Sequence, residues 1–134
     1  SLIMTPKDVP AQTIILKSDV KNLEKAEKYE TASNYEDTIF NLIKSAYQGV
    51  APDGYDVKPL EFKKEFEEVS LDGMKQYRGA GYDVYEVKIT ARTNINLHEA
   101  AFLKYFPGVV AIAIVNPTLF NGDHTRLIAV VRKS

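Results

Sequence analysis

The sequence predicts an α+β fold, in which an antiparallel or mixed sheet has helices packed on one face. Residues 85–92 alternate apolar and polar side chains, which is typical of a strand with one buried face. Residues 109–115 are apolar throughout, which favours a strand that is covered on both faces. Residues 34–49 combine helical apolar spacing with signals for a helix start and a helix end. These three segments supply the main elements of the predicted fold.

The length and composition predict one domain with its own hydrophobic core. The chain has 134 residues, of which 45% are hydrophobic and 26% are charged, as is typical of globular proteins. Residues 1–12 contain Pro6 and Pro10 and predict an extended lead-in, and residues 13–134 predict a single α+β domain. Because Met4 follows a Ser-Leu start, we expect the chain to be a domain excised from a longer protein.

Charge and residue content argue against several function classes. The chain has seventeen Lys and Arg residues and eighteen Asp and Glu residues, and positive and negative charges alternate along it. Because there is no basic cluster, the sequence does not favour nucleic-acid binding. The absence of cysteine excludes disulfides, thiolate catalysis and cysteine-ligated zinc. The longest apolar run, residues 109–115, is too short to span a membrane as a helix. The first residues lack a signal-peptide pattern, and the composition leaves the compartment open.

The first third of the chain predicts a strand, two helices and a loop. Residues 13–16 are β-prone and predict a short strand. Ser18 begins a segment with a thin apolar stripe, which predicts a largely exposed helix. Asn34 is a helix N-cap signal, and Gly49 supplies the left-handed stop that ends many helices. Residues 50–57 are rich in turn-forming residues and predict a loop.

Residues 59–71 fit two alternatives. Apolar residues at helical spacing after Pro59 fit a helix, because proline is well placed in a first helical turn. Asp72-Gly73 is a two-residue hairpin signal with residues 74–77 as the returning strand, and it favours a strand before it. We favour the strand. Residues 79–81, Gly-Ala-Gly, predict a bulge that interrupts the following strand.

The last third predicts a helix between strands and a final strand. Asn96, with a glutamate three residues later, predicts a helix over residues 97–106. Residues 109–115 form the predicted central strand, and residues 116–123 carry loop residues. Residues 127–131 predict a second apolar strand, which most simply pairs back on the first.

The predicted order of elements resembles the split βαβ arrangement of ferredoxin-like folds with an extra C-terminal strand. Residues 93–108 are long enough for a crossover between two parallel strands, and both strands then end at the same edge of the sheet. This edge brings residues 92–98 near residues 116–126. The polar residues expected there are Arg92, Asn94, Asn96, His98, Asn116, Asn121, Asp123, His124 and Arg126.

This edge is the candidate ligand-binding site. Arg92 and Arg126 suit an anion, because a guanidinium group offers a fork of donors, although each also suits a solvated strand end. His98 and His124 suit acid–base or metal chemistry, but no metal-ligand spacing accompanies them. The candidate ligand-binding residues are Arg92, Asn94, His98, Asp123, His124 and Arg126. We predict no catalytic residue, no metal and no cofactor.

Eight tyrosines and no tryptophan give the chain an unusual aromatic content. Tyrosine favours half-buried positions and interfaces, where its ring packs and its hydroxyl group stays wet. Tyr77, Tyr82 and Tyr85 are therefore candidate partner-binding residues. The alternative is that these three side chains cap the core, and the general behaviour of amphipathic rings favours that alternative.

These observations favour a non-enzymatic protein-interaction or assembly domain, part of a larger envelope or secretion-related protein. Its interaction surface would be a sheet edge or the hairpin that carries the three tyrosines. A protein partner or self-association is favoured over nucleic acid. The alternative is a binding domain for a small anionic ligand at the 92–98/116–126 edge, and a hydrolase that uses His98 or His124 with Asp123 ranks third.

Overall fold

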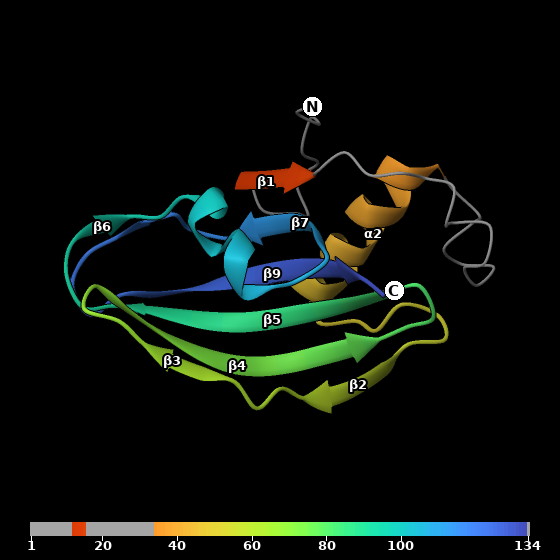
Figure 1. Cartoon of the computed structure of the whole chain (residues 1–134), viewed down its shortest axis with the longest axis horizontal. Helices are drawn as coiled ribbons and strands as arrows, with labels where there is room; N and C mark the ends of the chain where they lie inside the picture. The colour runs from red at the N-terminus through yellow and green to blue at the C-terminus, as the bar shows by residue number, and fades with distance from the viewer. Residues whose placement is uncertain (1–11, 16–33, 134) are drawn as a thin grey trace.

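The structure is a computed structural model that describes residues 12–15 and 34–133. These residues form an α+β fold with a mainly antiparallel seven-stranded sheet in the order β1-β7-β9-β5-β4-β2, with β3 also paired to β4 (Figure 1). The strands of this sheet are β1 (Gln12–Ile15), β2 (Asp56–Pro59), β3 (Lys63–Glu65), β4 (Val69–Arg78), β5 (Tyr82–Ala91), β7 (Val109–Ile114) and β9 (His124–Arg132). A small second sheet pairs β6 (Ile95–Asn96) with β8 (Thr118–Leu119), and the described helices are α2 (Tyr35–Gln48) and the 3₁₀ helix η2 (Glu99–Tyr105).

The crossover predicted over residues 93–108, between two parallel strands, is confirmed. Both β5 and β7 pair antiparallel with β9, which lies between them, so β5 and β7 run parallel to each other. The return of β9 onto β7 is also confirmed. The ferredoxin-like topology is not shown, because the segment between β5 and β7 holds only β6 and the short η2 and no long helix.

Helix α2 begins and ends where the sequence predicts. The Asn34 side chain accepts a hydrogen bond from the backbone N–H of Asp37 at 2.9 Å, which satisfies one free donor of the first turn. Gly49 adopts a left-handed conformation with φ 76° and ends the helix. The buried side of the helix comprises Thr38, Ile39, Leu42, Ile43 and Ala46.

Two hydrophobic clusters lie on opposite faces of the sheet. The first is between α2 and the sheet, where Ile39, Leu42 and Ile43 pack with Tyr77, Tyr82, Val84, Ala113, Ile128 and Val130. The second lies on the other face, where Phe102 and Phe106 of the η2 region pack with Leu71, Val87, Ile89, Ile112 and Leu127. Accordingly, α2 lies behind the sheet in Figure 1, and η2, drawn in cyan, lies in front of it.

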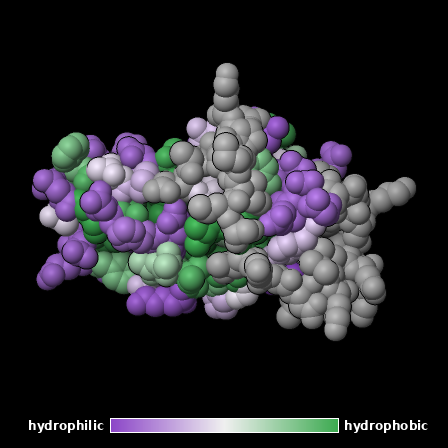
Figure 2. Space-filling model, turned by 90° about the horizontal axis from the view of Figure 1, so that it is seen from above, coloured by the Kyte–Doolittle hydropathy of each residue, from purple (hydrophilic) through white to green (hydrophobic). Residues whose placement is uncertain are grey.

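Strand β5 was predicted to have one buried face and one face exposed to solvent, but most of its residues are buried on both faces. Tyr82, Val84 and Glu86, which lie on the α2 side, are all buried, and so are Val87, Ile89 and Ala91 on the other face. Polar exposure on the α2 side begins with Lys88, where the helix no longer covers the sheet. Seen from above the β1 edge, hydrophobic and hydrophilic residues are interspersed over the described surface (Figure 2).

The Asp72-Gly73 hairpin prediction is wrong. Strand β4 runs through both residues, and the register against β5 shifts between Gly73 and Lys75, as in a β-bulge. The turn between β3 and β4 lies instead at Phe66, whose N–H donates to the Val69 carbonyl at 2.9 Å. Glycine is needed at position 73 because a Cβ atom there would lie 2.4 Å from the Leu60 carbonyl oxygen.

Residues 79–81 form the β4–β5 hairpin turn and not the predicted bulge. The Gly79 N–H donates to the Tyr82 carbonyl at 3.0 Å, and a Cβ atom at position 79 would lie 2.1 Å from the Tyr55 ring. The Asp72-Gly73 segment, predicted as a turn, is therefore a bulge, and residues 79–81, predicted as a bulge, are a turn. Both the bulge and the turn need glycine, and contacts with distant residues decide which of them each segment forms.

The remaining elements partly match the prediction. The strand alternative for residues 59–71 is confirmed by β3, and the strand at 13–16 by β1. The loop predicted at 50–57 ends in β2, and the helix predicted at 97–106 is the shorter η2 with His98 as its N-cap residue. The helix predicted after Ser18 lies outside the described residues.

A candidate interaction groove between β5, β9 and η2

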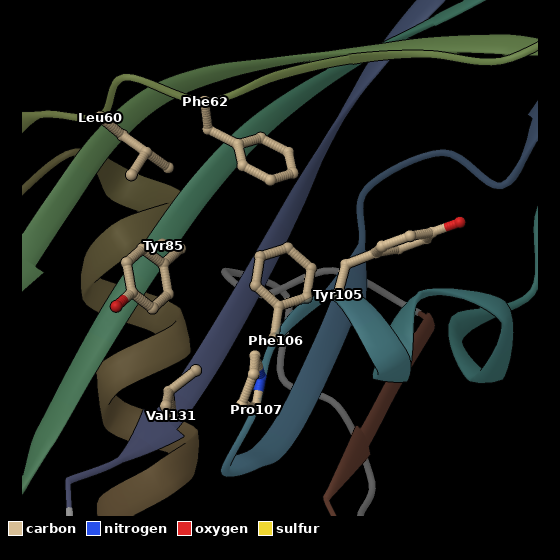
Figure 3. A pocket seen from close by; sticks show the side chains of 7 residues that line it. All are labelled: Leu60, Phe62, Tyr85, Tyr105, Phe106, Pro107 and Val131. Atoms are coloured by element: carbon tan, nitrogen blue, oxygen red, sulfur yellow. The ribbon is translucent and has the colours of Figure 1, made fainter.

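An apolar groove opens on the face of the sheet opposite α2. It has a volume of about 170 Å³. Seven side chains line it: Leu60, Phe62, Tyr85, Tyr105, Phe106, Pro107 and Val131. We call it the aromatic groove (Figure 3). Four of its seven side chains are aromatic rings, and the residues come from the β2–β3 connection, β5, η2 and its C-terminal end, and β9.

One wall of the groove is the segment between β2 and β3, which folds over β4. The Leu60 N–H donates to the Met74 carbonyl at 3.3 Å, and the Gly73 N–H donates to the Phe62 carbonyl at 2.7 Å. These two bonds hold Leu60 and Phe62 above the β-bulge. The segment between β2 and β3 can pass this close to β4 only because Gly73 has no side chain.

The opposite wall is the end of η2. Phe106 is buried, and its ring centroid lies 6.3 Å from that of Phe62 and 6.1 Å from that of Tyr85, both within the range of favourable aromatic pairs. Tyr105 packs on Phe66 with centroids 5.5 Å apart, and the ammonium group of Lys104 lies 5.4 Å from its ring centroid. Figure 3 shows the rings of Phe62 and Phe106 pointing toward one another across the groove.

The groove presents an uncharged surface. The described residues that line it carry no carboxylate, ammonium or guanidinium group. Burial raises the pKa of the Tyr85 phenol, the neighbouring Asp83 carboxylate raises this pKa further, and Arg78 lowers it. The Tyr85 side chain is therefore neutral over the physiological pH range. The side chains that line the groove are therefore suited to packing against apolar groups.

The tyrosines singled out from the sequence fall in two places. Tyr77 and Tyr82 lie in the cluster beneath α2, with 1% and 0% of their surfaces exposed, so their rings are not a docking surface in this fold. Tyr85 lines the aromatic groove. The other groove residues were not predicted as a site, because they come from three separate stretches of chain and no local motif joins them.

The predicted ligand edge is brought together in part. The Asn121 N–H donates to Oδ1 of Asn94 at 2.9 Å, and β6 pairs with β8, so the 92–98 and 116–124 segments do lie together. His98 and His124 are both exposed. Asp123 accepts a hydrogen bond from the Phe120 N–H at 3.0 Å and stabilises its own loop.

The two arginines of this edge already have separate partners. Arg92 forms an ion pair with Glu65 at 2.9 Å and donates to the Phe66 carbonyl. Arg126 forms an ion pair with Glu86 at 2.9 Å and donates to the Tyr47 carbonyl at 3.3 Å. Each guanidinium group is thus held by a different carboxylate and a different backbone carbonyl.

The described part of the chain offers no group of three or more His, Asp or Glu side chains arranged to hold a metal ion. None of its helices combines the length and the apolar character that crossing a membrane requires.

The fold and the groove define an α+β domain with an apolar groove on the face of its sheet opposite α2. The family model of the TraK C-terminal domain matches residues 24–131, which is most of the chain. The chain therefore belongs to the TraK C-terminal domain family, which is related to conjugation and type IV secretion. No curated protein matches it. Membership of a conjugation machinery implies protein partners.

Proposed function

We propose that this chain is a non-enzymatic interaction domain of a conjugation machinery, and that the aromatic groove receives an apolar side chain from another protein of that machinery. The observation that carries the proposal is the groove itself, which is formed by aromatic and aliphatic side chains around about 170 Å³ of space. An apolar cavity of roughly 150 Å³ binds benzene. The groove therefore has room for one large aliphatic or aromatic side chain.

The energetics of interfaces support the groove as the anchoring point. Binding energy in protein complexes concentrates in a few well-packed side chains that fill desolvated pockets. In the aromatic groove, Phe106 is held by Phe62 and Tyr85, so the walls are in place before a partner arrives. A preformed apolar pocket loses little conformational entropy on binding.

The sheet edge formed by β2 is a weaker candidate surface. β2 is four residues long, is exposed along its length and carries Lys58 and Pro59. Short edge strands with lysine and proline resist the addition of a further strand, because proline lacks a donor and a lysine ammonium group must stay hydrated. We therefore place the main interaction surface on the face of the sheet and not on this edge.

The second candidate function, binding of a small anionic ligand at the 92–98/116–126 edge, has less support. An anion that recruited Arg92 and Arg126 together would compete with Glu65 and Glu86, which pair with these arginines. The aromatic groove has no such competition, since its lining side chains are uncharged.

A groove-filling substitution tests the proposal. Val131 is partly exposed and lines the groove, so Val131→Phe places a ring in the space that a partner would occupy. The control is Val57→Phe, the same chemical change at an exposed position on β2, whose register partner Tyr77 belongs to the cluster on the other face of the sheet. Co-purification with the other proteins of the assembled conjugation machinery is measured for each variant, together with thermal stability.

We expect Val131→Phe to reduce co-purification by about tenfold or more, because filling an anchoring pocket removes a contact of the order of 2 kcal/mol. Val57→Phe is expected to co-purify like the wild type. A folded Val131→Phe variant that retains its partners at the wild-type level would refute the groove as the docking site.

A further inference from the structure

A second concave surface lies on the opposite face of the sheet, beyond the C-terminal end of α2. It has a volume of about 400 Å³. Its lining residues are Met74, Lys88, Val115, Asn116, His124, Thr125 and Arg126. We call it the cationic concavity. Arg126 connects the concavity to the end of α2. Its guanidinium carbon lies 5.1 Å from the centroid of the Tyr47 ring, near the end of the helix.

The strand register brings three basic side chains onto one face of this concavity. Lys88 of β5 lies directly opposite Arg126 of β9, and His124 is two residues before Arg126 on the same strand. Directly opposed residues of antiparallel strands have Cα atoms about 4.5–5.5 Å apart, and residues two apart on a strand share a face. All three side chains therefore project from the same side of the sheet.

Two carboxylates of this face, Glu86 and Asp72, each have a cationic partner. Glu86 is 4% exposed and pairs with Arg126 at 2.9 Å, and Asp72 pairs with Lys63 at 3.7 Å. Within residues 12–15 and 34–133, the side chains of Lys88 and His124 make no ion pair and no hydrogen bond. Lys88 lines the concavity, and Asp72, its register partner on β4, pairs with Lys63 and forms no ion pair with Lys88.

We propose that the cationic concavity binds an acidic peptide segment of a protein partner, with a glutamate or aspartate carboxylate on Lys88 and His124. Charge complementarity favours this occupant, because the side chains that line the concavity include three basic groups and no carboxylate, while the whole chain carries a net charge of −1. Met74, which is 40% exposed, and Val115 give the concavity an apolar border suited to the methylene groups of a glutamate.

The size of the site separates a peptide from other anions. About 400 Å³ is within the range of sites that bury several groups of a ligand, and it exceeds what a single phosphate fills. A nucleic acid would need a row of cationic side chains along its backbone, and the face offers a single uncompensated lysine beside one histidine. This surface is distinct from the aromatic groove, so the two can engage different segments of a partner.

The test uses a fluorescently labelled hexaglutamate peptide, with hexaglutamine as the uncharged control, and fluorescence anisotropy at low ionic strength. Lys88→Gln removes the unpaired charge, and Lys58→Gln removes the same charge at an exposed position on β2, outside the concavity. Inorganic phosphate serves as the competing small anion. Circular dichroism confirms the fold of each variant.

We expect hexaglutamate to bind the wild type and Lys58→Gln equally, Lys88→Gln about tenfold more weakly, and hexaglutamine not at all. Equal affinity of the wild type and Lys88→Gln, or no binding of hexaglutamate by the wild type, would overturn the proposal. Displacement of hexaglutamate by an equimolar amount of phosphate would also overturn it, because the site would then recognise a small anion and not an acidic peptide.

Discussion

The hydroxyl group of Tyr77 is a buried polar group without a partner among the described residues. The Tyr77 side chain is 1% exposed and packs in the cluster beneath α2. Burial raises the pKa of its phenol, the nearby Glu86 carboxylate raises this pKa further, and Arg126 lowers it. Leaving a buried hydroxyl group unpaired costs about 1–3 kcal/mol. The tyrosine at this position therefore lowers the free energy of unfolding relative to an apolar ring of the same shape.

Tyr77→Phe is expected to raise the free energy of unfolding by about 1 kcal/mol at neutral pH. Because the folded state raises the pKa above the ordinary value of 10.0, the wild type has its full stability below about pH 10 and loses stability as the pH rises through the folded-state pKa. The variant loses less stability over that range. Urea denaturation at neutral and alkaline pH measures both effects, and a variant less stable than the wild type at neutral pH would contradict them.

At the scale of single elements, the β-bulge of β4 places one wall of the aromatic groove. Gly73 lets the chain between β2 and β3 cross close above β4, and the Leu60 carbonyl oxygen would lie 2.4 Å from a Cβ atom at this position. The position of Leu60 and Phe62, and so the shape of the groove, depends on this glycine.

Gly73→Ala is expected to destabilise the fold by about 1–3 kcal/mol, because a backbone atom must move to admit the methyl group. The comparison variant is Gly49→Ala, where a Cβ atom meets nothing within 4 Å and the cost is only the strain of a left-handed conformation. Amide chemical shifts should change around Leu60 and Phe62 in Gly73→Ala and remain unchanged there in Gly49→Ala. Unchanged groove shifts in Gly73→Ala would show that the bulge does not position this wall.

The elements that sequence reasoning predicted are those with local signals. The cap at Asn34, the stop at Gly49, and the apolar strands β7 and β9 each depend on residues close in the chain, and each is confirmed. The roles of Asp72-Gly73 and residues 79–81 were exchanged, because glycine serves a bulge and a turn equally well. The deciding contacts, with Leu60 and Tyr55, come from distant parts of the chain.

The aromatic groove was beyond prediction for the same reason. Phe62 and Val131 are far apart in sequence, and the pairing of β4, β5 and β9 brings them to one site. Of the predicted partner-binding tyrosines, Tyr85 lines the groove and two are core residues. The ligand edge was predicted from the parallel direction of β5 and β7, which the structure confirms, but the ion pairs that occupy Arg92 and Arg126 required side-chain positions.

At the scale of the whole molecule, the described residues present two different surfaces on the two faces of one sheet. The aromatic groove lies opposite α2, and the cationic concavity lies on the α2 side beyond the end of the helix. A domain with an apolar surface and a charged surface on opposite faces is suited to join more than one segment of an assembly. This arrangement agrees with membership of a conjugation-related family.

The most direct measurement of the central claim is site-specific photo-crosslinking in cells that assemble the conjugation machinery. The photoreactive residue p-benzoyl-phenylalanine replaces Tyr105, which lines the aromatic groove, or Phe120, which is 65% exposed and does not line it. We predict that position 105 forms an adduct with an apolar segment of another protein of the machinery, identified by mass spectrometry, and that position 120 does not. A folded, assembled chain that forms no adduct at position 105, or the same adduct at both positions, would contradict the groove as the docking site.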